Sequence, residues 1–164
     1  MNLETLTDRA KGFLQSAQTV AIRNNHQRIA PEHLLKALLE DPEGLCAGLI
    51  KAEGGDATAA MRETDAALAK IPAVSGAGAN TPPNIDNDLV RVLDSAEQVA
   101  KKAGDSFVTV ERLLLALTLA TTTAAGKALK DAGVTSQALN AAINDLRRGR
   151  QAHSAGAENA YDAL

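Results

Sequence analysis

Two stretches of the sequence align with one another without a gap. SAQTVAIRNNHQRIAPEHLLKAL (16–38) falls on SAEQVAKKAGDSFVTVERLLLAL (95–117) when the chain is shifted by 79 residues. The register continues through Gly54 and Gly133, and 11 of the 39 positions from 16 to 54 are identical, at spacings typical of helices. Self-similarity at a fixed period indicates a repeated structural unit. The sequence therefore predicts two copies of one helical unit.

Apolar residues recur at helical spacing throughout both copies, and alanine, the best helix former, is abundant. Capping residues and glycines divide each copy into four helices. In the first copy the expected helices run from about Thr7 to Asn24, begin at Pro31, run from about Gly44 to Ala52 with Gly54 just beyond, and begin at about Asp56. In the second copy they run from about Ile85 to Ala103, begin after Thr109, end at Gly133, and run from about Thr135 to Leu146. We expect an all-α fold in which two four-helix units pack as one eight-helix, pseudo-twofold double repeat, because neither unit can bury its leucine face alone.

Changes in composition mark the boundaries of these units. A segment rich in Pro, Gly and Asn separates the copies, and the last residues lose their apolar periodicity. We expect repeat one over about 1–71, a loop over 72–84, repeat two over about 85–148, and a flexible linker over 149–164, so that the folded domain covers 1–148.

Composition excludes several classes of protein. Aromatic residues are 2% of the chain, which is unlike a β-sandwich or barrel, and the net charge of −3 is unlike that of a nucleic-acid-binding protein. No apolar run is long enough to span a membrane, and the N-terminus does not read as a signal peptide. We expect a cytoplasmic protein that binds neither nucleic acid nor membranes.

The motifs of common catalytic and metal sites are missing. Gly126-Lys127 lacks the other residues of a phosphate-binding loop, and Cys46 has no basic neighbour that would activate it, so we expect an inert, packed thiol. The three histidines are scattered, and we expect His33 at an exposed position in a helix first turn. We therefore expect no catalytic residues, no metal and no cofactor.

Four segments carry a resemblance to a known family: LTDRAKGFLQSAQTVA (6–21), IAPEHLLKALL (29–39), IPAVSG (71–76) and DLVRVLDSAEQVAKKAGDSFVTVERLLLAL (88–117). Together they resemble the N-terminal domain of the Clp ATPases. The long loop PAVSGAGANTPPN (72–84) and the tail AENAYDAL (157–164) are most similar to the disaggregase branch of that family.

The resemblance implies an eight-helix double repeat that captures exposed apolar segments of unfolded or aggregated proteins. A full-length homohexamer would thread these segments with ATP, together with the DnaK chaperone system, while the isolated domain, on a mobile linker, would be a monomer. An alternative is docking of an adaptor protein, as in the protease-linked ClpA and ClpC relatives. A role limited to spacing or gating the hexamer, and a small helical enzyme using Glu111, Asp105 and His33, are further alternatives.

The resemblance also ties three polar residues to substrate handling, namely Thr7, Asp105 and Glu111. Each has a structural interpretation as well. Thr7 is a candidate helix cap, and Glu111 is repeated by Glu32 in the first turn of the matching helix. Asp105 matches His26, so the fold does not require an acid there, and we expect an exposed turn residue whose loss changes stability little.

The apolar wall of the implied groove has four candidates in the sequence. These are Leu6, Phe13, Leu93 and Val99, although apolar residues at helical spacing belong to a core more often than to a site. Arg112 stands where some relatives have an apolar residue, so we expect a narrower or more polar edge at that point.

Overall fold

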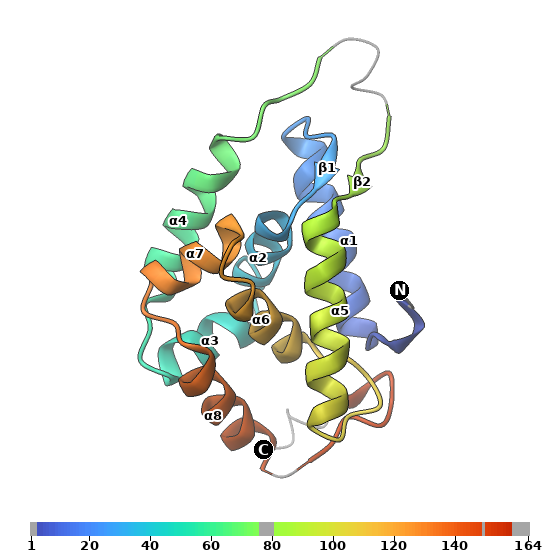
Figure 1. The fold of residues 1–164 in the computed structure, drawn as a ribbon, viewed down its shortest axis with the longest axis vertical. Helices are drawn as coiled ribbons and strands as arrows, with labels where there is room; N and C mark the ends of the chain where they lie inside the picture. Colours follow the sequence, from blue (N-terminus) through green and yellow to red (C-terminus); the bar gives the residue numbers. More distant parts are fainter. Residues whose placement is uncertain (1–2, 76–80, 149, 159–164) are drawn as a thin grey trace.

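The computed structural model describes residues 3–75, 81–148 and 150–158, and its regular structure is almost entirely helical (Figure 1). The helices are α1 (Asp8–Arg23), α2 (Pro31–Leu39), α3 (Leu45–Ala52), α4 (Ala57–Ala69), α5 (Asn87–Lys102), α6 (Val110–Leu119), α7 (Ala124–Asp131) and α8 (Ser136–Arg147). A short 3-10 helix, Leu3–Thr5, precedes them, and two-residue strands β1 (Arg28–Ile29) and β2 (Asn84–Ile85) stand before α2 and α5. The expected all-α fold is confirmed.

The helices begin and end where the sequence places their signals. The side chains of five N-cap residues accept a hydrogen bond from the backbone of the first turn: Thr7, Asp56, Asp86, Thr123 and Thr135. Such a bond satisfies one of the donors that a helix N-terminus leaves free.

Two glycines follow helices of the two copies in the left-handed conformation. The φ angles are 102° at Gly54 and 82° at Gly133, in the region that only glycine adopts without strain. The two positions are related by the 79-residue shift, so the same turn closes α3 and α7.

Backbone pairing joins the two copies symmetrically. Leu6 pairs in parallel with Val108, and Ile29 pairs in parallel with Ile85. The shift of 79 residues converts one pair into the other, because position 6 matches 85 and position 29 matches 108. Each copy therefore lends its entering segment to the turn between the first two helices of the other copy, which confirms the pseudo-twofold double repeat.

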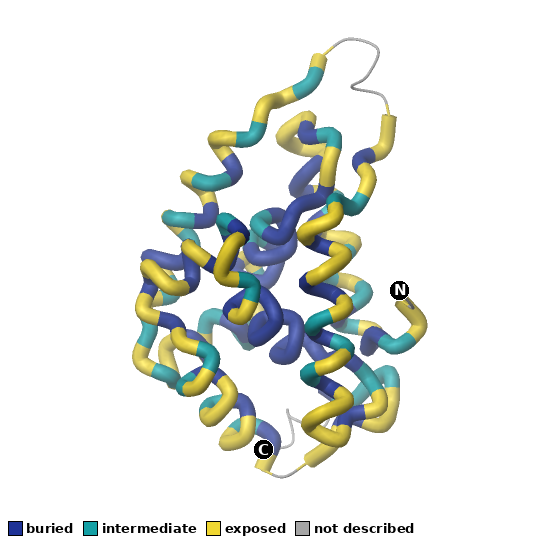
Figure 2. Tube along the Cα trace, in the orientation of Figure 1, coloured by how far each residue is buried: buried dark blue, intermediate teal, exposed yellow. Residues whose placement is uncertain are grey.

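The core lies between α2 and α6, which contact each other at the centre of the molecule. Both helices present leucines with no exposed surface: Leu34, Leu35, Leu38, Leu113, Leu114 and Leu117. Around them α4 packs on α7 and α3 packs on α8, so helices from different copies cover one another. Figure 2 shows the buried residues concentrated along these inner helices. Neither copy has a closed core of its own.

The segment after α8 differs from the prediction of a flexible linker. Residues 150–158, which we call the strap, return along the domain surface beside the turn between α5 and α6 (Figure 1). The carbonyl oxygen of Ala152 accepts hydrogen bonds from the amides of Ser106 and Phe107 at 2.7 and 3.0 Å. Residues 149 and 159–164 lie outside the described residues, and so does the loop over 76–80; the domain boundaries themselves stay a prediction.

Candidate functional site

A buried cluster of charged side chains lies at the end of the molecule where α5, α6 and α8 meet. Its centre is Arg147, the last residue of α8, whose side chain is 3% exposed. Arg147 donates from Nη1 to Asp105 Oδ1 at 2.6 Å, from Nε to Glu111 Oε2 at 3.1 Å, and from Nη2 to Thr109 Oγ1 at 2.7 Å. Two of the three polar residues that the resemblance tied to substrate handling are thus ion-paired to one arginine.

Asp105 is buried, which corrects the expectation of an exposed turn residue. Its carboxylate also accepts hydrogen bonds from Arg112 Nε at 3.3 Å and from the amide of Ala152 at 2.9 Å. Burial alone would raise the pKa of Asp105, but the hydrogen bonds from Arg147 and Ala152 and the two positive charges leave that pKa below its ordinary value. The turn is covered because α8 and the strap both close over it.

The matching turn in repeat one carries two histidines in place of the aspartate and the arginine. His26 and His33, which match Asp105 and Arg112, are also buried, with His26 Nδ1 and His33 Nε2 2.8 Å apart. The amide of Ala30 donates to His33 Nδ1 at 2.8 Å, so the neutral His33 ring carries its proton on Nε2 and donates it to His26. The expectation that His33 is exposed is wrong, because the turn folds back over the first turn of α2.

Burial keeps both of these rings neutral. It lowers the pKa of His33 to about 4, with a further contribution from His26, and it lowers the pKa of His26 as well. Repeat one therefore carries a neutral pair where repeat two carries an ion pair.

Thr7 and Glu158 form a second buried contact close to this cluster. Thr7 caps α1 by accepting the Ala10 amide at 3.2 Å, and its hydroxyl donates to Glu158 Oε2 at 2.6 Å. The amide of Val110, the first residue of α6, donates to the same oxygen at 3.0 Å. Burial raises the pKa of Glu158, more than the hydrogen bonds from Thr7 and Val110 lower it. The capping interpretation of Thr7 is confirmed, and its part in substrate handling stays a prediction.

Sequence reasoning missed both Arg147 and Glu158. A signal for Arg147 exists, because the 79-residue shift places it on Leu68, an apolar position of α4 that faces the core. That match indicates an inward-facing site at the end of α8. Glu158 lies in a segment without periodicity, and no sequence signal indicates its burial.

The structure does not bring the four apolar candidates onto one surface. Leu6 and Leu93 are 3% and 2% exposed and belong to the core. Phe13 lines two hollows between α1 and the segment from α2 to the start of α3, whereas Val99 lines a separate groove.

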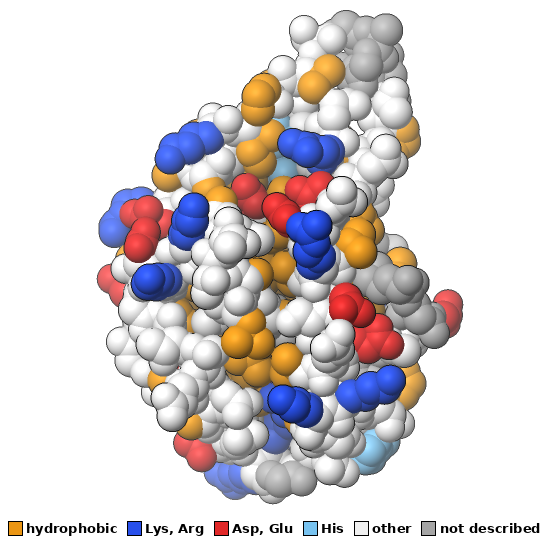
Figure 3. Space-filling model, in the orientation of Figure 1, with side chains coloured by type: hydrophobic (Ala, Val, Ile, Leu, Met, Phe, Trp, Pro, Cys, Tyr) orange, Lys and Arg blue, Asp and Glu red, His pale blue; other side chains and the backbone are white. Residues whose placement is uncertain are grey.

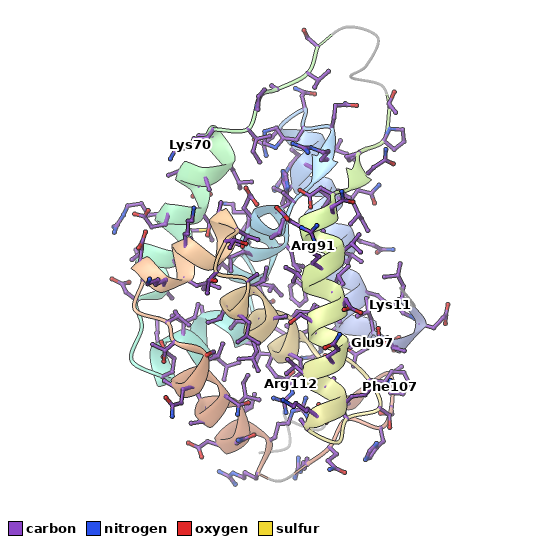
Figure 4. The ribbon with its side chains drawn as sticks, viewed as in Figure 1. Lys11, Lys70, Arg91, Glu97, Phe107 and Arg112 are labelled. Atoms are coloured by element: carbon purple, nitrogen blue, oxygen red, sulfur yellow. The ribbon has the colours of Figure 1, made fainter. Side chains whose placement is uncertain are left out.

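The groove that contains Val99 lies between α5, α6 and α8 and has a volume of about 580 Å³. Apolar atoms make up most of its surface, and Leu119, at its end, is 45% exposed. Figure 3 shows apolar side chains gathered in a hollow over α6, and in Figure 4 the side chain of Arg112 lies beside the lower part of α5. We call it the α5–α6–α8 groove; it is lined by Val99, Lys102, Ala103, Arg112, Leu115, Leu119, Ser136, Gln137 and Asn140.

A second groove, of about 730 Å³, lies between α1 and the two short strands. Polar and apolar atoms share its surface about equally. We call it the α1 groove; it is lined by Leu3, Glu4, Leu6, Lys11, Leu14, Gln15, Gln18, Ile29, Pro83, Asn84 and Ile85. Neither groove contains Asp105 or Glu111.

Reactive and metal-binding groups are few in the part of the chain that the structure describes. Cys46 is buried, and burial raises the pKa of its thiol strongly, so the expected inert, packed thiol is what the structure shows. Across residues 3–75, 81–148 and 150–158 no three His, Cys, Asp or Glu side chains form a group that could hold a metal ion. No helix within those ranges combines the length and the apolar character of a membrane span.

Comparison with known proteins gives concordant results for sequence and fold. The family model described as Clp repeat (R) N-terminal domain matches residues 5–132. Over all 164 residues the chain is 56% identical to chaperone protein ClpB of Rhodopseudomonas palustris and 52% identical to that of Agrobacterium fabrum. It spans only 18% of the length of each of these two relatives.

Among solved structures, the chain is similar to the Hsp104 N-terminal domain from Candida albicans. The TM-score is 0.77 at 24% identity, covering 93% of this chain and 97% of that one. The N-domain of ClpV from Vibrio cholerae gives a TM-score of 0.70 at 18% identity, covering 87% and 84%. At these identities the two likenesses show the fold alone.

Proposed function

Because the chain belongs to the family of Clp repeat N-terminal domains, we propose that it is the non-catalytic substrate-binding domain of a ClpB-like disaggregase. The resemblance read from the sequence is thereby confirmed for the family. The domain captures exposed apolar segments of unfolded or aggregated proteins. The observation that supports this role most directly is the α5–α6–α8 groove, whose surface is mainly apolar.

The apolar lining of this groove suits client segments that folded proteins keep buried. Val99, Ala103 and Leu115 line it, and Leu119 is exposed at its end, so an apolar client side chain loses water on binding without a directional contact. Lys102 and Gln137 stand at the rim, where they offer hydrogen bonds to an extended backbone. Such a surface binds apolar side chains without requiring a particular client sequence. Affinity is weak, since ordering an extended chain offsets much of the gain.

Arg112 makes one edge of the groove polar. Its guanidinium is fixed from two sides, by Asp105 and by Asn140 Oδ1, which accepts from Nη1 at 3.2 Å. A side chain held in this way narrows the groove and does not swing into it. We infer that clients with a small or polar residue beside their apolar anchor bind at this edge.

The rest of the mechanism lies in parts of the relatives that this chain does not span. We propose that a full-length homohexamer threads captured segments with ATP, in cooperation with the DnaK system, and that the protein works in the cytoplasm. Docking of an adaptor, as in ClpA- or ClpC-like proteins, is the alternative. Full-chain similarity to proteins named ClpB favours the disaggregase role.

The test is an NMR titration of the chain with a reduced, alkylated protein that cannot refold. We expect shift changes at Val99, Leu115 and Leu119, and a Leu119→Ser variant that binds several-fold more weakly, because a large part of one leucine no longer leaves water. Ile22→Ser is the matched control, since Ile22 is 54% exposed on α1 and lines neither groove. Shift changes confined to the α1 groove, with affinity lost in Leu3→Ser instead, would overturn the assignment.

A further inference from the structure

The strap is attached to the domain mainly through hydrogen bonds. The amides of Ser106 and Phe107 donate to Ala152, and the amide of Asp8, at the start of α1, donates to the carbonyl oxygen of Ala155 at 2.8 Å. Among the apolar residues of the strap only Ala152 is buried. Burial of apolar surface therefore contributes little to holding it in place.

Glu158 supplies the anchor at the far end of the strap. Its side chain has no exposed surface, and its Oε2 fills a small pocket formed by the Thr7 hydroxyl and the amide of Val110. The positive end of α6 faces the carboxylate there. Oε1 of Glu158 has no partner among the described residues, and the same holds for Oε1 of Glu111, whose negative charge opposes ionisation of Glu158. The Glu158 carboxylate is thus bound through Oε2, while Oε1 accepts no hydrogen bond from the described residues.

A few hydrogen bonds and one buried alanine hold the strap, and the conformational entropy lost in ordering its nine residues offsets much of what they contribute. A segment with this balance opens locally without unfolding of the domain.

We propose that the strap is a releasable latch, closed by the seating of Glu158 between Thr7 and the start of α6. When the latch is closed, Glu158 is the last anchored residue that the structure describes. When it is open, the chain leaves at the end of α8, at Arg148, which adds ten residues, or up to about 35 Å of extended chain. The chain spans only 18% of the length of its relative from Rhodopseudomonas palustris, and in a protein of that length the latch would set the reach between this domain and the rest.

The latch gives Thr7 and Asp105 a role that does not depend on contact with clients. Thr7 holds the anchor, and Asp105 holds the strap through the amide of Ala152. Neither groove has a strap residue in its described lining, so client binding and the latch are separable by experiment.

Amide hydrogen exchange of the whole chain, resolved by NMR, tests the latch. In Glu158→Ala we expect the amides of Asp8, Ser106 and Phe107 to exchange at least tenfold faster, while those of α2 keep their protection. Glu158→Gln retains an oxygen that accepts both hydrogen bonds, so its exchange stays within about threefold of the unchanged chain. Asp145→Asn is the control, because it removes an exposed carboxylate from α8.

Three results would overturn the proposal. Unchanged exchange at these three amides in Glu158→Ala would show that Glu158 does not hold the strap. Equal acceleration in α2 would show that Glu158 supports the whole fold and closes no latch. Exchange in Glu158→Gln as fast as in Glu158→Ala would show that the two hydrogen bonds to Oε2 do not provide the anchor.

Discussion

Replacing Arg147 by methionine tests the buried cluster most directly. Methionine fills a similar volume but donates no hydrogen bond, so the carboxylates of Asp105 and Glu111 lose their shared partner in a site from which water is excluded. Removing one partner of a buried ion pair costs about 3–5 kcal/mol, because the remaining charge stays desolvated. For a chain of this length 1 kcal/mol corresponds to roughly 2–4 °C in melting temperature, so we expect a drop of about 6–20 °C.

Thermal and urea unfolding, followed by circular dichroism at pH 7, measure this loss. Arg148→Met is the matched control, since Arg148 is the exposed neighbour of Arg147, and we expect a change within about 0.5 kcal/mol. A triple variant that adds Asp105→Asn and Glu111→Gln neutralises the two carboxylates that lose Arg147, and we expect it to recover part of the loss. If Arg147→Met loses less than about 1 kcal/mol, or if neutralising the acids recovers nothing, the charges in this cluster are not desolvated as described.

Three further predictions concern single positions. The pKa of His33 is about 4 in the folded state and 6.5 in the unfolded state, so the stabilisation from its neutral ring is fully present above pH 6.5. About 3 kcal/mol of the free energy of unfolding is lost as the pH falls from 6.5 to 4. Urea unfolding at several pH values measures this loss, and an equally steep loss in a His33→Gln variant would contradict the assignment to His33. Gly126→Ala places a methyl group against the carbonyl oxygen of Ala120, and we expect it to lower the free energy of unfolding by about 1–3 kcal/mol in melting experiments. Gly12→Ala adds a methyl group in open space on α1, and we expect it to raise that free energy by up to about 1 kcal/mol. Equal effects of the two substitutions would refute the crowding at Gly126. Asp105→Ala lowers stability by about 3–5 kcal/mol, which urea unfolding measures, and an unchanged midpoint would mean that the turn is exposed after all.

The helices and their order could be predicted because the information is local. Caps such as Thr7 and Asp56, the left-handed Gly54 and the 3.6-residue periodicity all act within one or two turns of chain. The repeat also gave information about residues far apart in the chain, because two similar segments at a fixed shift adopt similar structures. From this similarity we predicted that the two copies pack on one another. The prediction of helix boundaries was accordingly within a residue or two.

The polar cluster could not be predicted in the same way. Asp105 lies 42 positions before Arg147, and Thr7 lies 151 positions before Glu158, so nothing in the local sequence shows that they meet. An aspartate after a glycine in a turn is normally exposed, and His33 in a helix first turn is normally exposed as well. The expectation for Asp105 failed because α8 and the strap cover its turn, and the expectation for His33 failed because the preceding turn folds back over the start of α2. Both are properties of the tertiary fold.

The backbone pairings Leu6–Val108 and Ile29–Ile85 give the molecule the geometry of an isologous dimer contained in a single polypeptide. In a true homodimer every substitution appears twice, so a change that suits one site must also be tolerated at its symmetry mate. A fused chain is free of that constraint. A neutral histidine pair therefore occupies the turn of one copy, and an aspartate–arginine pair occupies the matching turn of the other.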